Sequence, residues 1–234
     1  MDDTKNFETF LFINPKYSKI SVHQKSDSKI IYEQSFFFND NLLNINFDQL
    51  KDFLEGNIFK IEKVLSIFIK DIILIIDFDI FFKVQIAIKK NNNGNIVNSK
   101  DLSYLLNEAK VQCKKTMDGK KIVHMLIDNY QIDNKNYSIL PKDLKCNYLS
   151  LDVSFICLSK DVIKNLEEIL KKYQISITKM ISADYIKSFF FNEDSDYIKM
   201  SKKLLEGYNQ NEVVLINKTK KMEGFFEKFF HFYS

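Results

Sequence analysis

Five consecutive aliphatic residues, Ile72–Ile76 (IILII), constrain the fold of this chain more than any other feature of its sequence. Such a run is typical of a strand covered on both faces, which requires helices layered on a sheet. Apolar runs in 9–13, 20–22 and 30–38 predict three strands before it. A one-face helical pattern begins at Phe47, after Asn46 as its cap. Gly56-Asn57 is expected to interrupt it, and the same spacing at 58–68 predicts a second helical segment or a continuation. The order of three strands, helix and strand predicts an α/β fold.

A second unit is predicted to begin near Phe78, where the spacing of apolar residues changes from continuous to alternating. The elements expected after it are a strand at 82–88, a helix capped by Ser99, a strand at 122–127, a turn at 130–137, a strand at 149–157, a helix capped by Ser159, a strand from Ile175, helices at 183–191 and 198–205, and a strand at 213–216.

The charge pattern argues against a nucleic-acid partner. All 34 basic residues are Lys, they are interspersed with 31 acidic residues, and the formal net charge is only +3. Proteins that bind nucleic acids usually present a face of one sign and use Arg for paired contacts to phosphates and bases. Cys113, Cys146 and Cys157 lie far apart without metal-ligand spacing, so we expect no metal site, no disulfide framework and a reducing compartment.

Neither a leader nor a membrane span is expected. The acidic start Met1-Asp2-Asp3 is unlike a signal peptide, and charged residues interrupt the most apolar stretch, 58–82. A span needs about 20 nearly uncharged residues. The sequence therefore predicts a soluble, cytoplasmic protein.

No group of residues predicts catalysis. His23, His124 and His231 stand alone, and His124 lies in an apolar strand where a hydrogen-bonded core histidine is the favoured interpretation. Solvation explains the acidic pairs Asp77/Asp79 and Glu167/Glu168 better than acid–base chemistry does. The asparagine-rich loop at 91–95 holds one Gly and cannot cradle a phosphate as a glycine-rich loop does. We expect no enzyme activity and no cofactor.

The aromatic residues near the end of the sequence have two interpretations. Phe225, Phe226, Phe229 and Phe230 recur at helical spacing. Such a stripe is typical of an interfacial membrane anchor, which would make the protein a peripheral membrane protein. We favour the alternative that these rings fill a core or cover a sheet edge, because few Lys accompany them.

A series of motifs between residues 101 and 190 resembles the inserted domain of FtsA, the actin-like bacterial cell-division protein. They are the helix DLSYLLNEAK (101–110), His124-Met125-Leu126 with Tyr130-Gln131-Ile132-Asp133, the strand LSLDVSFICLS (149–159), the helix NLEEILKKYQISI (165–177) and MISADYIKSFF (180–190). The FtsA relative of pilus assembly shares this architecture, and the run at His124, Tyr130 and Asp133 favours the division branch.

The resemblance implies half of an actin-like (ribonuclease H-like) lobe, made of residues 1–78 and 179–234 around an inserted strand–helix–strand–strand domain at 79–178. The strand at 213–216 would follow the insertion, and the chain would end before the second lobe that closes over the nucleotide.

Both phosphate loops depart from the family pattern. The first, normally containing Asp and Gly, has Asn14 and Lys16 at the matching positions; the second, normally Asp with three Gly, has Asn217 and Lys218. Without Gly the backbone cannot approach a phosphate closely, and without the carboxylate a Mg²⁺ ion loses its anchor. We therefore expect no ATP binding.

The resemblance implies an adaptor in the division machinery, at the inner face of the cell membrane at the division site. Its partners would be division proteins or FtsA-like subunits, bound through the inserted domain by edge-strand pairing or helix docking.

Overall fold

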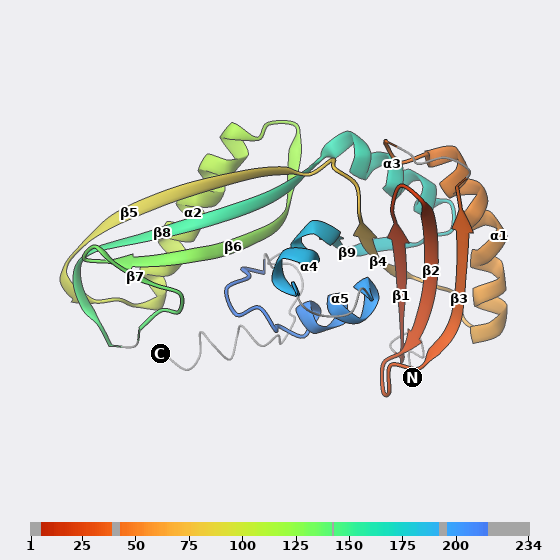
Figure 1. Ribbon diagram of the computed structural model, residues 1–234, viewed down its shortest axis with the longest axis horizontal. Coiled ribbons are helices and arrows are strands. Elements are labelled where there is room, and N and C mark those ends of the chain that lie inside the picture. Colours follow the sequence, from red (N-terminus) through yellow and green to blue (C-terminus); the bar gives the residue numbers. More distant parts are fainter. Residues whose placement is uncertain (1–5, 39–42, 142, 192–195, 215–234) are drawn as a thin grey trace. The chain divides into compact units, whose positions relative to one another are not determined.

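A computed structural model describes residues 6–38, 43–141, 143–191 and 196–214 (Figure 1). By its internal contacts the chain forms two compact units. The first unit holds the described residues up to Phe81 together with Leu158–Tyr208, and the second unit holds Phe82–Cys157 and the described residues from Asn209.

The first unit is built on a mixed five-stranded sheet in the order β3-β2-β1-β4-β9. β1 is antiparallel to β2, and β2 is antiparallel to β3, whereas β4 is parallel to both β1 and β9. The strands are β1 (Phe7–Ile13), β2 (Tyr17–Gln24), β3 (Ile30–Phe37), β4 (Asp71–Ile76) and β9 (Ser176–Ser182).

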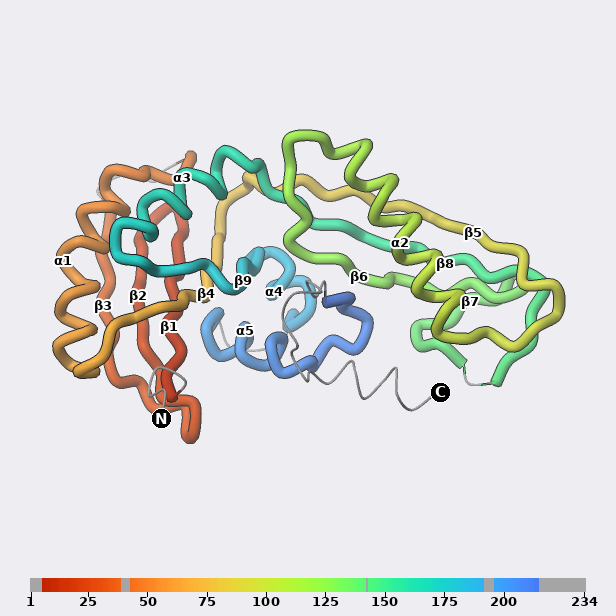
Figure 2. The backbone as a smooth tube through the Cα atoms, turned by 180° about the vertical axis from the view of Figure 1, so that it is seen from behind, coloured from red at the N-terminus to blue at the C-terminus, as the bar shows by residue number. Residues whose placement is uncertain are grey.

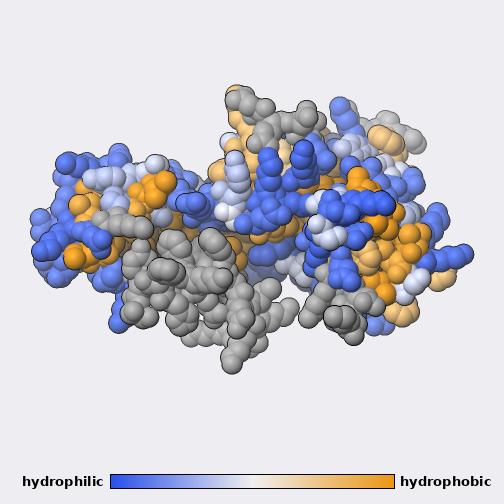
Figure 3. All heavy atoms as spheres, turned by 90° about the horizontal axis from the view of Figure 1, so that it is seen from below, coloured by the Kyte–Doolittle hydropathy of each residue, from blue (hydrophilic) through white to orange (hydrophobic). Residues whose placement is uncertain are grey.

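Helices cover both faces of this sheet. α1 (Phe47–Leu65) and α3 (Lys160–Lys171) lie on one face, and α4 (Ala183–Phe189) and α5 (Tyr197–Leu205) lie on the other, as the opposed views of Figures 1 and 2 show. β4 is buried from Ile72 to Ile76, as its aliphatic run predicts. Figure 3 looks at the end of the first unit where β1 and β4 begin.

α1 begins as predicted but does not break. The Asn46 side chain accepts a hydrogen bond from the Gln49 backbone N–H, which confirms the cap. The predicted interruption at Gly56 is wrong, because Asn57 is held inside the unit: its amide donates to the Phe53 carbonyl, and its Oδ1 accepts from the Tyr32 hydroxyl. These bonds and the burial of the next turn outweigh the low helix propensity of Gly.

The second unit is a four-stranded sheet in the order β5-β8-β6-β7 with one helix, α2, packed against β5 and β6. Leu105, Ala109 and Cys113 of α2 meet the apolar side chains of the strands in one buried core. The elements are β5 (Phe82–Ile96), α2 (Ser99–Thr116), β6 (Lys120–Ile132), β7 (Lys135–Tyr137) and β8 (Lys145–Ser159).

Three details of this unit differ from the prediction. β5 continues beyond the predicted 82–88 and through the asparagine-rich loop at 91–95, because its pairing with β8 shifts register between Asn91 and Asn95 and then resumes. The expected turn at 130–137 is a hairpin of β6 and β7. α2 is capped by Asn98, one residue before the predicted Ser99, in a capping box with Asp101.

The predicted α/β fold class is confirmed: a mixed five-stranded sheet carries helices on both faces, and a second sheet with one helix is inserted between β4 and α3. Of the predicted strand at 213–216 the structure describes only 213 and 214, which belong to no strand, and the described strand that joins the five-stranded sheet after the insertion is β9. Glu212 instead forms an isolated bridge with Leu126, inside the second unit. The predicted bounds of the inserted domain, 79 and 178, stay a prediction. The compact second unit has a main segment that runs from Phe82 to Cys157.

Candidate functional site

The turn between β1 and β2, which the FtsA resemblance matches to a first phosphate loop, has a backbone that is hydrogen-bonded within the turn. Asn14 is 9% exposed, and its Oδ1 accepts hydrogen bonds from the N–H groups of Lys16, at 2.8 Å, and Tyr17, at 2.7 Å. The Asn14 N–H donates to the Tyr17 carbonyl, and Pro15 has no N–H.

The consequence is chemical. A phosphate loop binds by aiming several backbone N–H groups at the anion. Here every N–H from Asn14 to Tyr17 is either bonded inside the turn or missing. An anion would have to displace the Asn14 side chain, so this turn does not form a ready phosphate site.

An ion pair lies at the end of the neighbouring strand. Lys187 of α4 donates from Nζ to Asp77 Oδ1 at 2.6 Å, directly after β4. Burial alone would lower the pKa of Lys187, but the hydrogen bond and the charge of Asp77 outweigh it, and the pKa is raised. The interpretation of Asp77 as a merely solvated carboxylate is therefore wrong, since the cation from α4 neutralises it.

Aromatic rings fill the space above the same strand ends. Tyr197 stacks on Phe12 with centroids 5.0 Å apart, Tyr17 lies against Phe12 at 5.5 Å, and Phe37 lies against Tyr17 at 5.4 Å. The pKa of Tyr17 is raised by burial, and next by the neighbouring Tyr197 and Asp77. Ligands of open α/β sheets bind beyond the carboxyl ends of the strands. In this chain a row of rings and a salt bridge occupy that place.

Several predicted site residues lie outside the described part of the chain. They are Asn217 and Lys218 of the second phosphate loop, and Phe225, Phe226, Phe229 and Phe230 of the membrane segment. The predictions for them stay predictions.

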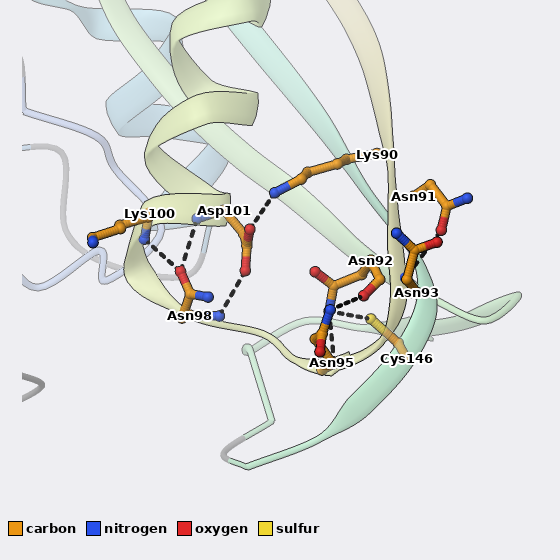
Figure 4. Close-up of polar contacts among 9 residues, drawn as sticks. All are labelled: Lys90, Asn91, Asn92, Asn93, Asn95, Asn98, Lys100, Asp101 and Cys146. Carbon is orange, nitrogen blue, oxygen red and sulfur yellow. Dashed lines mark hydrogen bonds and ion pairs between the residues drawn. The ribbon is translucent and has the colours of Figure 1, made fainter.

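The asparagine-rich loop of β5 lines an open hollow of about 620 Å³ in the second unit, with Lys90, Asn98, Asp101 and Lys145 (Figure 4). Asn93 and Gly94 adopt positive φ angles, 52° and 76°, which let the strand turn through its register shift. The close-up shows the side chains turned toward one another along this bend.

Most polar groups of the hollow bind to their neighbours. The Asn92 amide donates to the Asn95 carbonyl at 2.6 Å and lies 3.5 Å from the Cys146 sulfur. Asp101 closes the capping box on Asn98 and forms an ion pair with Lys90. The hollow is thus a bulge and a helix start joined by their own hydrogen bonds, and these bonds explain its residues without a ligand.

The structure describes two of the three histidines, His23 and His124, and both are buried and hydrogen-bonded. His124 is buried, and its Nδ1 lies 2.8 Å from Glu212 Oε1, which confirms the interpretation as a hydrogen-bonded core histidine. His23 is buried as well and bonds to Ser21; burial, and next the charge of Lys202, lower its pKa. Within the described residues, no three His, Cys, Asp or Glu side chains lie close enough together to hold a metal ion.

The sequence pattern did not single out Lys202 of α5, whose amine is buried in the first unit. Its Nζ is buried without a hydrogen-bond partner, 3.9 Å from Glu8 Oε2 and 5.6 Å from the centroid of the Phe10 ring. Burial lowers the pKa of Lys202. Its position on the apolar side of α5, beside Ile198, was the available signal.

β5 is the long edge of the second unit. It pairs with β8 on one side, and no other strand of the described residues pairs with its second side. Its charged side chains are all Lys: Lys83, Lys89 and Lys90. No helix in the described part of the chain is long and apolar enough to cross a membrane.

No family model matches this chain, and no curated protein matches it. Solved structures resemble it at low identity. The cytoplasmic domain of EpsL, an inner-membrane component of the type II secretion system of Vibrio cholerae, is 6% identical, with a TM-score of 0.40, 77% of this chain covered and 58% of that one.

Two further structures resemble the chain. The PilM–PilN type IV pilus biogenesis complex has a TM-score of 0.47 and 7% identity, with 78% of this chain and 49% of that chain covered. A Bacteroides thetaiotaomicron protein of actin-like ATPase fold and unknown function has a TM-score of 0.36 and 14% identity, with 82% and 59% covered. The chain spans between half and three fifths of the matched chains, and these scores carry no argument on activity or partners.

Proposed function

We propose that this protein is an adaptor of the actin-like type that binds other proteins, without nucleotide binding and without enzyme activity. The observation that carries the proposal is the closed β1–β2 turn, in which Asn14 takes the N–H groups that a phosphate would need. The motifs that resemble FtsA support the cell-division machinery, at the inner face of the membrane, as the setting.

The second unit is the proposed contact body. It has a hydrophobic core of its own, and its β5 edge offers backbone groups to an added strand. Edge strands commonly recruit extended peptide segments in this way. Because the charged residues of β5 are all Lys, the segment that fits best carries acidic residues.

The nucleotide part of the proposal is tested by titrating ATP with Mg²⁺ into the protein in a calorimeter. We expect no binding heat. Micromolar affinity would overturn this part of the proposal.

The partner part is tested by removing the second unit's main segment. Phe82 and Cys157 are directly paired across β5 and β8, so a two-residue turn in place of 83–156 can rejoin the first unit. Purified cytoplasmic segments of division proteins and of pilus proteins serve as baits. We expect a division bait to bind the whole chain and to lose that binding in the shortened variant. Retention of the bait by the variant, or binding of pilus baits alone, would contradict the proposal.

A further inference from the structure

The end of the first unit where the parallel strands begin forms one continuous surface, which we term the amino end. β1 and β4 run in the same direction and β2 runs opposite, so the β2–β3 turn and the α1–β4 loop reach the same end. The α3–β9 loop joins them, because β9 starts beside β4. The amino end therefore consists of residues 25–29, 62–71 and 171–175.

Positive charge dominates this surface. Among its described residues, six exposed lysines face three carboxylates: Lys25, Lys29, Lys63, Lys70, Lys171 and Lys172 against Asp27, Glu62 and Asp71. One of the carboxylates, Glu62, already accepts a hydrogen bond from the Ile69 backbone N–H at 3.2 Å. At the opposite end of the unit the charges are mixed, since Lys187 pairs with Asp77 there and Lys16 and Lys199 are exposed near Asp184 and Asp196.

Large apolar side chains project from the amino end. Phe68 is 76% exposed and Val64 is 56% exposed, and Ile30, which follows the β2–β3 turn directly, is 52% exposed. Figure 3 looks onto this end of the first unit, at the right, where hydrophobic atoms gather between hydrophilic ones.

The loop that presents Phe68 is well anchored. Ser66 ends α1 with a φ of 56°, the left-handed conformation that turns the chain out of the helix. Ile69 is buried on the far side of Phe68, and its N–H bonds to Glu62. Between these two anchors the Phe68 ring points into solvent, although burying it would gain free energy.

We infer that the amino end docks on an anionic membrane surface. Lysines near such a surface are attracted by its negative potential, and exposed aromatic and aliphatic side chains insert at the headgroup level. Val64 lies in the last turn of α1, Phe68 in the α1–β4 loop and Ile30 at the start of β3. Apolar side chains that project from separate elements fit a soft lipid interface better than the groove of a protein partner. The inference is independent of the proposed adaptor function and of the segment at 225–230.

The test is sedimentation of the full chain with phosphatidylcholine vesicles, with and without phosphatidylserine. We expect binding only to the anionic vesicles, and loss of binding at high salt. Lys29→Gln with Lys172→Gln removes two charges, each worth about 1 kcal/mol at the surface, so the partition coefficient should fall about 30-fold. Phe68→Ser should lower it at least about tenfold.

Matched controls lie at the opposite end of the same unit. Phe37 is 70% exposed, and Lys16 and Lys199 are exposed there as well. Phe37→Ser, and Lys16→Gln with Lys199→Gln, should leave vesicle binding unchanged. Urea unfolding of each variant separates a lost surface from a lost fold.

Three outcomes would overturn the inference. The first is no sedimentation with anionic vesicles, even if an acidic protein binds to the same lysines. The second is an equal loss of vesicle binding in the amino-end variants and in the control variants of the opposite end. The third is binding that survives the amino-end variants and disappears only when residues 222–234 are deleted.

Discussion

Asn14 shows how a single side chain sets what a turn can bind. Its amide oxygen takes two backbone N–H groups that a glycine-rich loop would leave open. The same residue type is common in turns because its side chain mimics a backbone acceptor. The hydrogen bonds of the Asn14 side chain thus have two effects: they stabilise the hairpin, and they occupy the N–H groups that would otherwise bind an anion.

This role predicts the effect of two substitutions. Asn14→Ala leaves the N–H groups of Lys16 and Tyr17 without their acceptor and should lower the free energy of unfolding by about 1–2 kcal/mol. Asn14→Asp keeps an acceptor oxygen and should remain close to the wild type. Urea denaturation followed by circular dichroism measures both, and an alanine variant as stable as the wild type would show that Asn14 does not hold the turn.

The buried thiols give a prediction about reactivity. Cys113 and Cys157 lie with their sulfurs 3.8 Å apart, and burial, with Cys113 as neighbour, raises the pKa of Cys157 to about 12. Burial also raises the pKa of Cys113 and of Cys146. The nucleophile in alkylation is the thiolate, so the native protein at pH 8 should resist iodoacetamide while the urea-unfolded chain takes three labels. Mass spectrometry counts the labels; full labelling without urea would contradict the burial of these thiols.

At the scale of elements, α5 is held to the sheet by an apolar contact that contains one charge. Ile198, Met200 and Leu204 of this helix are buried, and the Lys202 amine lies over the Phe10 ring. Because the folded-state pKa of Lys202 is lowered, its protonated form destabilises the native state below that pKa. The penalty disappears as pH rises through the folded pKa toward the unfolded value of about 10.5.

Lys202→Met should therefore raise the free energy of unfolding by about 1 kcal/mol at pH 7, since a buried, poorly paired charge is replaced by an apolar chain of similar length. The gain should shrink as the pH approaches 10.5. Lys199→Met, on the exposed face of α5, is the matched control and should have no effect. A loss of stability in Lys202→Met at pH 7 would mean that the contact with Glu8 outweighs the burial of the amine.

At the scale of the whole molecule, the described residues form two hydrophobic cores, one in each unit. Leu54 belongs to the core of the first unit and Leu105 to that of the second, and both are fully buried. Each unit therefore has its own source of stability, although the first unit is made of two separate segments.

Separate cores predict separate unfolding transitions in calorimetry. Leu54→Ala should lower the free energy of unfolding of the first unit alone, and Leu105→Ala that of the second unit alone, each by about 2–5 kcal/mol. Fluorescent labels on one unit at a time assign the transitions. A single transition that both variants shift equally would mean that the two units unfold as one.

Much of each element could be predicted along the chain, because its signals are local. The alternation of β8, the aliphatic run of β4 and the caps at Asn46 and Ser159 depend on neighbours a few residues away. The loss of a glycine-rich loop at Asn14 and Lys16 is equally visible in the sequence.

Contacts between residues that are far apart in the sequence were decided only by the tertiary structure. Lys187 and Asp77, or His124 and Glu212, are brought together by the order and direction of strands, which no local pattern encodes. The continuation of α1 through Gly56 likewise depends on Tyr32 of β3, whose hydroxyl donates a hydrogen bond to the Asn57 side chain. Periodicity reports which face of an element is buried, whereas the partner on that face follows from the packing of the entire chain.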